Sequence, residues 1–283
     1  MAADGAQLGR TVQETIGYFG SAPEKPTFHA NDHGLDNWRP DPHPVTFHDA
    51  RTWSKPPTLQ REGFMIADHR TAVRDFADRE EVRRTYGGEL AELIRGLTGA
   101  RKVFGFPIGH MRFSPRSDRY KTGHNSQPAH FPHVDCTMKT AHGLVDSAFF
   151  GITKEELKPG EVLVGYNVWR VISEPPQDMP LAVCDARTVA PEDLVEADGV
   201  YDQGDQPWMR AEAYLVRHNP AHRWAYFKDM RPDEALVFRT YGNEPEWVAG
   251  VPHCAFQDPT CPPEAGPRIS VESRAYAIFD APE

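Results

Sequence analysis

Apolar and polar residues alternate along many short segments of this chain, and turn-forming residues separate the segments. Alternation with a period of two is typical of half-buried β-strands, whose successive side chains point to opposite faces. The pattern predicts an edge strand at 10–19 and further strands at 103–113, 131–138, 161–172, 211–218, 222–228, 234–241, 252–256 and 268–279. We expect residues 218–222, which contain Asn219-Pro220, to join two of these strands as a hairpin. The strand spacing predicts a mostly β protein, built as a sandwich or a barrel.

One segment, 78–99, has helical periodicity instead. Its apolar residues recur at spacings of three and four and would form one face: Val82, Tyr86, Leu90, Leu93, Ile94 and Leu97. Asp78 and Glu81 have the spacing of a capping box, and Gly99 would end the helix. Gly87-Gly88 predicts a kink or a break, because each glycine costs about 1 kcal/mol relative to alanine. We expect this helix to lie on the outside of a sheet.

Residues 1–60 are rich in proline, histidine and aspartate and show little periodicity. Prolines at 40, 42, 44, 56 and 57 predict an extended arm after the edge strand. Trp38, Phe47 and Trp53 are unusual in a disordered tail, so we expect the arm to pack on the main body. The predicted organisation is a Pro-rich wrapping arm, 1–60, followed by one β domain, 61–283.

Composition and net charge exclude some classes of binding partner. Lysine and arginine total 31 and aspartate and glutamate 41, so the net charge is 31 − 41 = −10, and no long basic run is present. Nucleic acid and anionic membrane surfaces are therefore not expected as partners. No apolar stretch of about 18 residues and no signal peptide is evident, so no membrane span is predicted. The four cysteines form no CxxC pair, and we expect reduced thiols in a cytoplasmic protein.

His133 and Asp135 carry the strongest chemical signal. Residues two apart on a strand share a face, so both side chains can approach one cation. His253, which lies 253 − 135 = 118 residues further on, would complete a two-histidine, one-carboxylate triad that leaves positions open on Fe(II). The pair can instead be surface residues or a hydrogen-bonded core pair. A second spacing, His130 with His133, would suit a helical face, but Pro132 opposes a helix there.

The C-terminal segment adds an anion-binding pattern. Alternation over 268–276 places Arg268, Ser270, Glu272 and Arg274 on one face. An arginine fork with a nearby hydroxyl suits a carboxylate, which arginine binds through two parallel hydrogen bonds. Either arginine can instead pair with Glu272.

Six motifs occur in a fixed order along the chain: Pro132-His133-Val134-Asp135, Tyr166-Asn167-Val168-Trp169-Arg170, Pro180-Leu181-Ala182-Val183-Cys184-Asp185, Asp229-Met230-Arg231-Pro232-Asp233-Glu234-Ala235-Leu236, Val251-Pro252-His253-Cys254-Ala255-Phe256 and Arg268-Ile269-Ser270-Val271-Glu272-Ser273-Arg274. Over roughly residues 60–280 this set resembles the hydroxylase/desaturase family. That family includes the partner component of the cephamycin cephem-methoxylase and many fungal and bacterial natural-product oxygenases.

The resemblance implies a double-stranded β-helix (jelly-roll, cupin-like) core with flanking helices that uses Fe(II), the cosubstrate 2-oxoglutarate and O2. It implies His133, Asp135 and His253 as iron ligands and catalytic residues. It also implies Arg268, helped by Ser270, as the anchor of the distal carboxylate of 2-oxoglutarate. Arg268 lies 268 − 253 = 15 residues after His253, a longer spacing than expected, so Arg274 is an alternative anchor.

Six side chains are weaker candidates for contact with the substrate: Arg112, Asn167, Trp169, Arg170, Tyr226 and Lys228. Asn167 and Trp169 share one strand face while Arg170 lies opposite, and Trp169 fits a plain core position better. The polar segment 116–130 is either a lid over the site or a solvated surface loop.

The leading functional interpretation is an oxygenase that hydroxylates or desaturates an unactivated C–H bond of a small secondary metabolite. One alternative is a jelly-roll scaffold with a degenerate metal site that supports another biosynthetic enzyme. A third interpretation is a cupin-like metal hydrolase or a cosubstrate-independent dioxygenase. A small-molecule substrate is expected as partner, with a homodimer or a biosynthetic partner enzyme left open.

Overall fold

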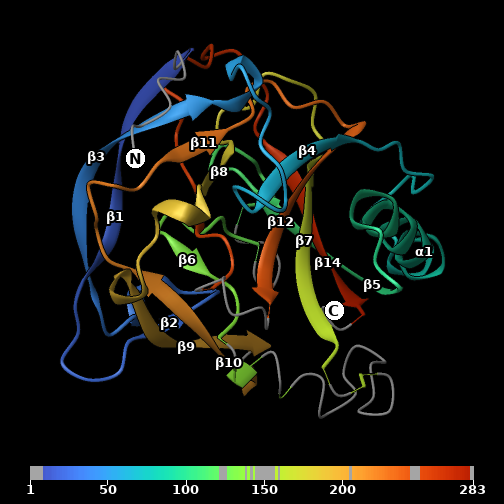
Figure 1. Ribbon diagram of the computed structural model, residues 1–283. Coiled ribbons are helices and arrows are strands. Elements are labelled where there is room, and N and C mark those ends of the chain that lie inside the picture. The colour runs from blue at the N-terminus through green and yellow to red at the C-terminus, as the bar shows by residue number, and fades with distance from the viewer. Residues whose placement is uncertain are drawn as a thin grey trace.

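The computed structural model describes residues 9–120, 126–137, 139–140, 143, 157–158, 160–203, 206–242 and 249–280. Two curled sheets face each other and form a jelly-roll, with helix α1 on the outer side of the smaller sheet (Figure 1). The predicted mostly β, jelly-roll architecture is confirmed. Among the described residues, no helix has the length and apolar character that a membrane crossing requires.

The larger sheet has nine strands. Their order across the sheet is β1 (Thr11–Ser21), β3 (Arg39–Asp49), β11 (Trp224–Tyr226), β8 (Leu181–Cys184), β13 (His253–Ala255), β6 (His133–Val134), β10 (Gln206–Val216), β9 (Leu194–Gln203) and β2 (Thr27–His29). Neighbouring strands are antiparallel except β3–β11 and β2–β9, which are parallel. The strands that carry the two metal-candidate histidines, β6 and β13, are direct neighbours.

The smaller sheet has five antiparallel strands. Their order is β4 (Phe64–Asp68), β12 (Glu234–Gly242), β7 (Val162–Val171), β14 (Ile269–Phe279) and β5 (Lys102–Phe113). The central strands β7, β12 and β14 are buried along almost their whole length. Both of their faces are covered, because the larger sheet lies on one side and α1 on the other.

The core between the sheets combines residues from both. Phe64, Trp169, Leu236 and Phe238 of the smaller sheet pack with Leu181, Val183 and Ala225 of the larger one. A second cluster joins α1, through Tyr86, Leu90 and Ile94, to the outer face of the smaller sheet. Arg268, which immediately precedes β14, is therefore adjacent to a rigid strand that is covered on both faces.

Helix α1 (Arg79–Thr98) begins and ends where the sequence predicts. The Asp78 carboxylate accepts from the amides of Glu80 and Glu81, and Gly99 closes the helix in the left-handed conformation. The capping box is only half formed, since the Glu81 carboxylate accepts instead from the amide of Asp75.

The predicted break at Gly87-Gly88 is wrong, because α1 runs without interruption. A Cβ on Gly105 of β5 would come within 2.0 Å of the Gly87 carbonyl oxygen, so this pair of glycines lets helix and strand backbones meet directly. The contact between the two backbones explains why Gly87 is present. The local sequence pattern alone predicted only a weakening of the helix at this position.

Residues 11–49 contribute β1, β2 and β3 to the larger sheet, with Phe47 fully buried. Pro40, Pro42 and Pro44 lie within β3, which pairs with β1 along its length. On its other side β3 meets β11 only from Phe47 to Asp49. The division into an arm, 1–60, and a domain, 61–283, stays a prediction.

The predicted hairpin at 218–222 is wrong. Strands β10 and β11, which this loop connects, are separated in the sheet by β6, β13 and β8. The strand predicted at 131–138 shrinks to β6, because Pro132 has no amide to donate and the chain bends at Asp135. Residue 138 lies outside the described residues. Strands β2, β3, β4, β8 and β9 were not predicted.

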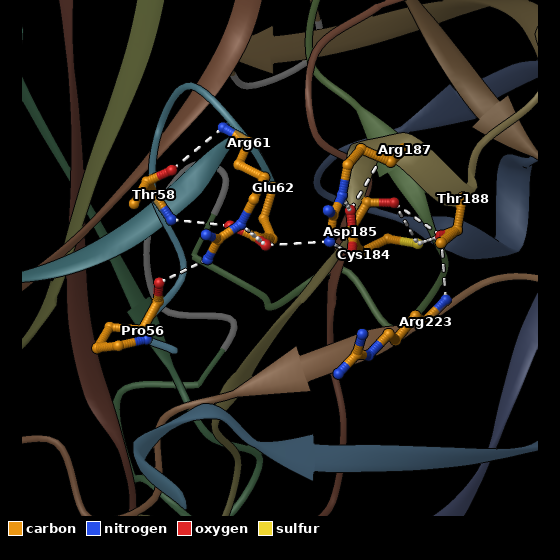
Figure 2. A network of polar contacts seen from close by, with 9 residues as sticks. All are labelled: Pro56, Thr58, Arg61, Glu62, Cys184, Asp185, Arg187, Thr188 and Arg223. Carbon is orange, nitrogen blue, oxygen red and sulfur yellow. Dashed lines mark hydrogen bonds and ion pairs between the residues drawn. The ribbon is translucent and has the colours of Figure 1, made fainter. Parts of the chain in front are cut away.

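A buried polar network joins the turn before β4 to the end of β8 (Figure 2). Arg187, in the 3-10 turn Ala186–Thr188, donates to both carboxylate oxygens of Asp185 and to Glu62 at 2.7–3.0 Å. Glu62 also accepts from the Thr58 amide and from Arg61. Both carboxylates are nearly inaccessible to solvent. Arg187 bridges the two, and Arg61 adds a second positive charge beside Glu62.

Candidate metal centre and active site

Two neighbouring strands and the bend after one of them bring His133, Asp135 and His253 together. His133 and His253 are directly opposite each other in the β6–β13 pair, so their side chains share a face. The Asp135 carboxylate lies 3.6 Å from His133 Nε2 and 3.7 Å from His253 Nε2. One ligand atom from each residue lies within 4.8 Å of the other two, which is the spacing of donors around a single metal ion.

Both imidazole rings are fixed through their other nitrogen. His133 Nδ1 lies 3.0 Å from the Phe131 carbonyl, and His253 Nδ1 lies 3.1 Å from the Val251 carbonyl. A carbonyl can only accept, so each Nδ1 carries the proton and each Nε2 presents a lone pair to the triad. Burial, followed by the neighbouring His253, lowers the pKa of His133 to about 4, which keeps this ring neutral at pH 7.

The Asp135 carboxylate is held by two partners from the smaller sheet. Asn167 Nδ2 donates to Oδ2 at 2.5 Å and Arg274 Nη2 lies 3.2 Å from the same oxygen. Arg274 Nε also donates to Asn167 Oδ1, which fixes the amide so that its NH2 group faces Asp135. Burial raises the pKa of Asp135, but Arg274, both histidines and Asn167 together hold it below its usual value. The carboxylate is therefore ionised and oriented, as a metal ligand must be.

Arg268 has a different environment from Arg274. It is 1% exposed, and its guanidinium carbon lies 5.7 Å from the centre of the Trp169 ring. Its Nε and Nη2 and the hydroxyl of Ser270 have no hydrogen-bond partner among the described residues. Burial lowers the pKa of Arg268 to about 9, and Asp178 partly opposes that effect.

A buried guanidinium with unused donors costs free energy unless a ligand completes it. These donors, together with the hydroxyl of Ser270, fit the distal carboxylate of 2-oxoglutarate, while Arg274 is already engaged by protein groups. The triad supplies the imidazole and carboxylate donors that a non-haem Fe(II) centre uses.

Three of the six candidate substrate residues lie on the inner face of the smaller sheet, because each is paired across the sheet with an inward-facing residue of β14. Asn167 is opposite Arg274, Trp169 opposite Glu272, and Arg112 opposite Ser270. Asn167 contacts the triad itself rather than open space. Trp169 is 2% exposed and belongs to the core between the sheets, as its core interpretation predicts.

The other three candidates are not brought to the triad. Arg170 points to the opposite face, where it donates to the hydroxyl of Tyr86 and contacts His69 under α1. Tyr226 is on the face of the larger sheet opposite His253, because Ala225, and not Tyr226, is in line with Val183 and His253. The Lys228 ammonium pairs with Asp258 at 3.2 Å. Arg170 and Lys228 have polar partners and the Tyr226 ring packs against Phe256, so the assignment of these three residues as substrate contacts gains no support.

Three residues near the triad were not predicted as site residues: His110, Tyr201 and Glu272. His110 is opposite Glu272 in the β5–β14 pair, and burial followed by Arg112 and Arg274 lowers its pKa to about 3. Burial, reinforced by Asp135, raises the pKa of both Tyr201 and Glu272. The alternation around Glu272 was visible in the sequence, but only its register with β5 reveals His110.

The predicted lid, 116–130, is only partly described, since 121–125 lie outside the described residues. Arg116 donates to the Pro263 carbonyl at 2.7 Å and Gln127 to the Asn31 carbonyl at 2.8 Å. Its role as a lid stays a prediction.

The family described as "YDMC: Oxidoreductase/YMDC permease-like domain" matches residues 16–278. The chain belongs to this family of oxidoreductases.

Individual relatives agree. The chain is 33% identical over 233 residues to the alpha-ketoglutarate-dependent dioxygenase phiK of a fungal species (strain ATCC 74256), which covers 78% of this chain and 79% of phiK. It is 30% identical over 247 residues to the hydroxylase/desaturase CTB9 of Cercospora beticola, which covers 80% of this chain and 73% of CTB9. A solved structure of the iron and alpha-ketoglutarate-dependent endoperoxidase NvfI superposes with a TM-score of 0.80 at 25% identity, covering 96% of this chain and 99% of NvfI.

The motif order therefore identified the family correctly. The protein is an Fe(II)- and 2-oxoglutarate-dependent dioxygenase, as predicted, and its cofactors are Fe(II), 2-oxoglutarate and O2.

Proposed function

We propose that His133 Nε2, one carboxylate oxygen of Asp135 and His253 Nε2 hold Fe(II), and that Arg268 with Ser270 binds the distal carboxylate of 2-oxoglutarate. The observation that carries the second assignment is the buried Arg268 guanidinium, whose Nε and Nη2 have no partner among the described residues. Arg274 is the weaker candidate because it already contacts Asp135 and Asn167.

Iron with 2-oxoglutarate and O2, when bound, supplies the oxidising power for an unactivated C–H bond. The protein's own groups orient and protect that chemistry. The backbone carbonyls of Phe131 and Val251 keep both imidazoles in the tautomer that ligates through Nε2. Asn167 and Arg274 keep Asp135 ionised, so binding a cation requires no proton to leave that carboxylate.

Aromatic side chains gather beside the first ligand. The Phe131 ring lies 5.4 Å from that of His133 and 5.2–5.7 Å from the rings of Trp38 and Phe28. These rings belong to a buried hydrophobic cluster, which shields the His133 imidazole from water. The proposed substrate is a small metabolite, and the reaction is hydroxylation or desaturation at a C–H bond held near the iron.

Candidate metabolites incubated with Fe(II), 2-oxoglutarate and O2 should yield succinate together with a product that has gained one oxygen or lost two hydrogens, as seen by mass spectrometry. The variant His133→Ala should lose both signals. Product formed at the wild-type rate by that variant would reject the triad as the metal site.

The scaffold alternative, with a degenerate metal site, gains no support from a triad in which both imidazoles and the carboxylate are oriented. A homodimer or a biosynthetic partner enzyme stays part of the proposal, to be tested by light scattering coupled to size-exclusion chromatography. The cytoplasm is proposed as the compartment because all four cysteines are free thiols. Segment 116–130 is proposed as a lid, which limited proteolysis with and without 2-oxoglutarate would test.

A further inference from the structure

The backbone of Arg268 is held from both sides immediately before β14 begins. Its amide donates to Asp178 Oδ1 at 2.9 Å, and its carbonyl accepts from the Ser114 amide at 2.9 Å. The Ser114 hydroxyl donates in turn to Asp178 Oδ2 at 2.5 Å. These three bonds form a closed ring of contacts around one residue.

Asp178 is itself rigidly placed. It is 1% exposed, and its carbonyl accepts from the Asp258 amide at 3.0 Å and from Gln257 Nε2 at 2.9 Å. The loop that follows β13 thus holds Asp178, and Asp178 holds the start of β14. Arg116 reaches the same carboxylate only at 3.7 Å and is 42% exposed, so it contributes little.

The carboxylate of Asp178 accepts hydrogen bonds from a backbone amide and a hydroxyl, and no hydrogen bond joins it to the guanidinium of Arg268. A buried cation is stabilised by a nearby anion even without direct contact. An acid bonded directly to the guanidinium would compete with an incoming carboxylate. Arg274 shows that second arrangement, since Asp135 lies directly against its Nη2.

We propose that Asp178 is a positioning residue for 2-oxoglutarate. Together with Ser114 it fixes where the Arg268 side chain begins and places a negative charge near the guanidinium, while it leaves Nε and Nη2 free to bind the distal carboxylate. This inference rests on the proposed role of Arg268.

The test is anaerobic titration of the Fe(II)-loaded enzyme with 2-oxoglutarate and, separately, with pyruvate, followed by the visible charge-transfer absorbance. Pyruvate keeps the 2-oxo acid group but has no distal carboxylate. Asp178→Ala should raise the Kd of 2-oxoglutarate roughly tenfold, the equivalent of one lost hydrogen bond to a charged group. It should leave the Kd of pyruvate unchanged. Asp178→Asn should recover most of the lost affinity, because an amide can accept from the Arg268 amide and donate to the Ser114 hydroxyl, and the small deficit that is left measures the lost negative charge.

Asp185→Ala is a matched control, since Asp185 is equally buried but belongs to the Arg187 network (Figure 2). It should leave the ratio of the two Kd values at the wild-type value. If Asp178→Ala does not fold, Ser114→Ala removes one bond of the ring and should raise the 2-oxoglutarate Kd a few-fold, again without affecting pyruvate.

Equal weakening of both ligands, or of neither, would overturn the inference. So would an Asp178→Asn protein as impaired as Asp178→Ala. If Arg268→Met itself binds 2-oxoglutarate normally, the proposed anchor fails as well, whatever Asp178 does. If Arg268→Met is impaired and Asp178→Ala is not, only the positioning role fails.

Discussion

Replacing Arg268 and Arg274 separately by methionine distinguishes a cosubstrate anchor from a support of the metal ligand. Arg268→Met removes donors that have no partner among the described residues. Arg274→Met removes an ion pair at 3.2 Å to Asp135 and a hydrogen bond at 3.1 Å to Asn167. Methionine fills a similar length without charge or donors, so each substitution removes mainly the polar interaction.

The expected effects differ in kind. A charge-assisted hydrogen bond contributes about 1.5–3 kcal/mol, and two such bonds to a carboxylate, less the cost of burying the pair, leave about 3 kcal/mol. The Kd of 2-oxoglutarate should therefore rise roughly 150-fold in Arg268→Met, at 1.36 kcal/mol for each factor of ten. In Arg274→Met the loss should fall on the metal, with iron affinity reduced by about 10–100-fold, as is usual for groups that orient a ligand.

Two titrations measure the two effects: anaerobic 2-oxoglutarate binding at saturating Fe(II), and Fe(II) binding in competition with a chelator. Thermal unfolding provides an independent readout. Arg268→Met should be as stable as the wild-type protein or more so, because a buried guanidinium with unused donors is removed. If Arg274→Met weakens 2-oxoglutarate more than Arg268→Met does at saturating iron, the anchor is Arg274 and the assignment made from the unused donors is wrong.

Three further experiments, two of them with a matched control variant, test the surroundings of the site and the fold. Asn167→Ala should lower iron affinity about tenfold, because Asp135 loses its 2.5 Å donor, and chelator competition measures it; unchanged affinity would show that Asp135 needs no support. Gly105→Ala should destabilise the protein by about 2 kcal/mol or more, since its Cβ would meet the Gly87 carbonyl oxygen at 2.0 Å. The control Gly88→Ala, whose Cβ would have no atom within 4 Å, should stabilise the protein by up to about 1 kcal/mol. Urea unfolding measures both variants, and equal free energies of unfolding would reject the helix–strand contact. Arg187→Met should lower the free energy of unfolding by about 2 kcal/mol, because buried Asp185 and Glu62 each lose a donor. The control Arg83→Met loses only an exposed pair with Glu80 and should change that free energy by less than about 0.5 kcal/mol. Similar losses in both variants would contradict the role of the network.

Local signals in the sequence were sufficient for the elements that depend on local physics. The caps of α1 at Asp78 and Gly99 act within a few residues, and alternation located β5, β7, β12 and β14 closely. The two-residue spacing of His133 and Asp135 correctly predicted that they share a site, although a bend at Asp135, and not a continuous strand, completes their approach. The contribution of His253 required the family's motif order, since spacing alone does not say which distant histidine arrives.

Contacts between distant segments were not predictable in the same way. The hairpin at 218–222 failed because a turn signal reports a change of direction and not which strand lies next to which. Strand β9 was missed because Glu196, Asp198 and Gly199 interrupt its apolar pattern. The significance of Gly87 depends on Gly105 in another element, and that of Asp178 depends on a backbone amide, which leaves no trace in side-chain patterns.

The three prolines of β3 have a consequence for the behaviour of the protein in concentrated solution. From Arg39 to Thr46, β3 is bonded to β1, and the β11 pairing begins only at Phe47. Pro40, Pro42 and Pro44 have no N–H to offer, so the stretch lacks the regular donors that a foreign strand would need to zip onto it. The prolines from which an extended, packed arm was predicted thus make this stretch of β3 a poor template for edge-to-edge aggregation.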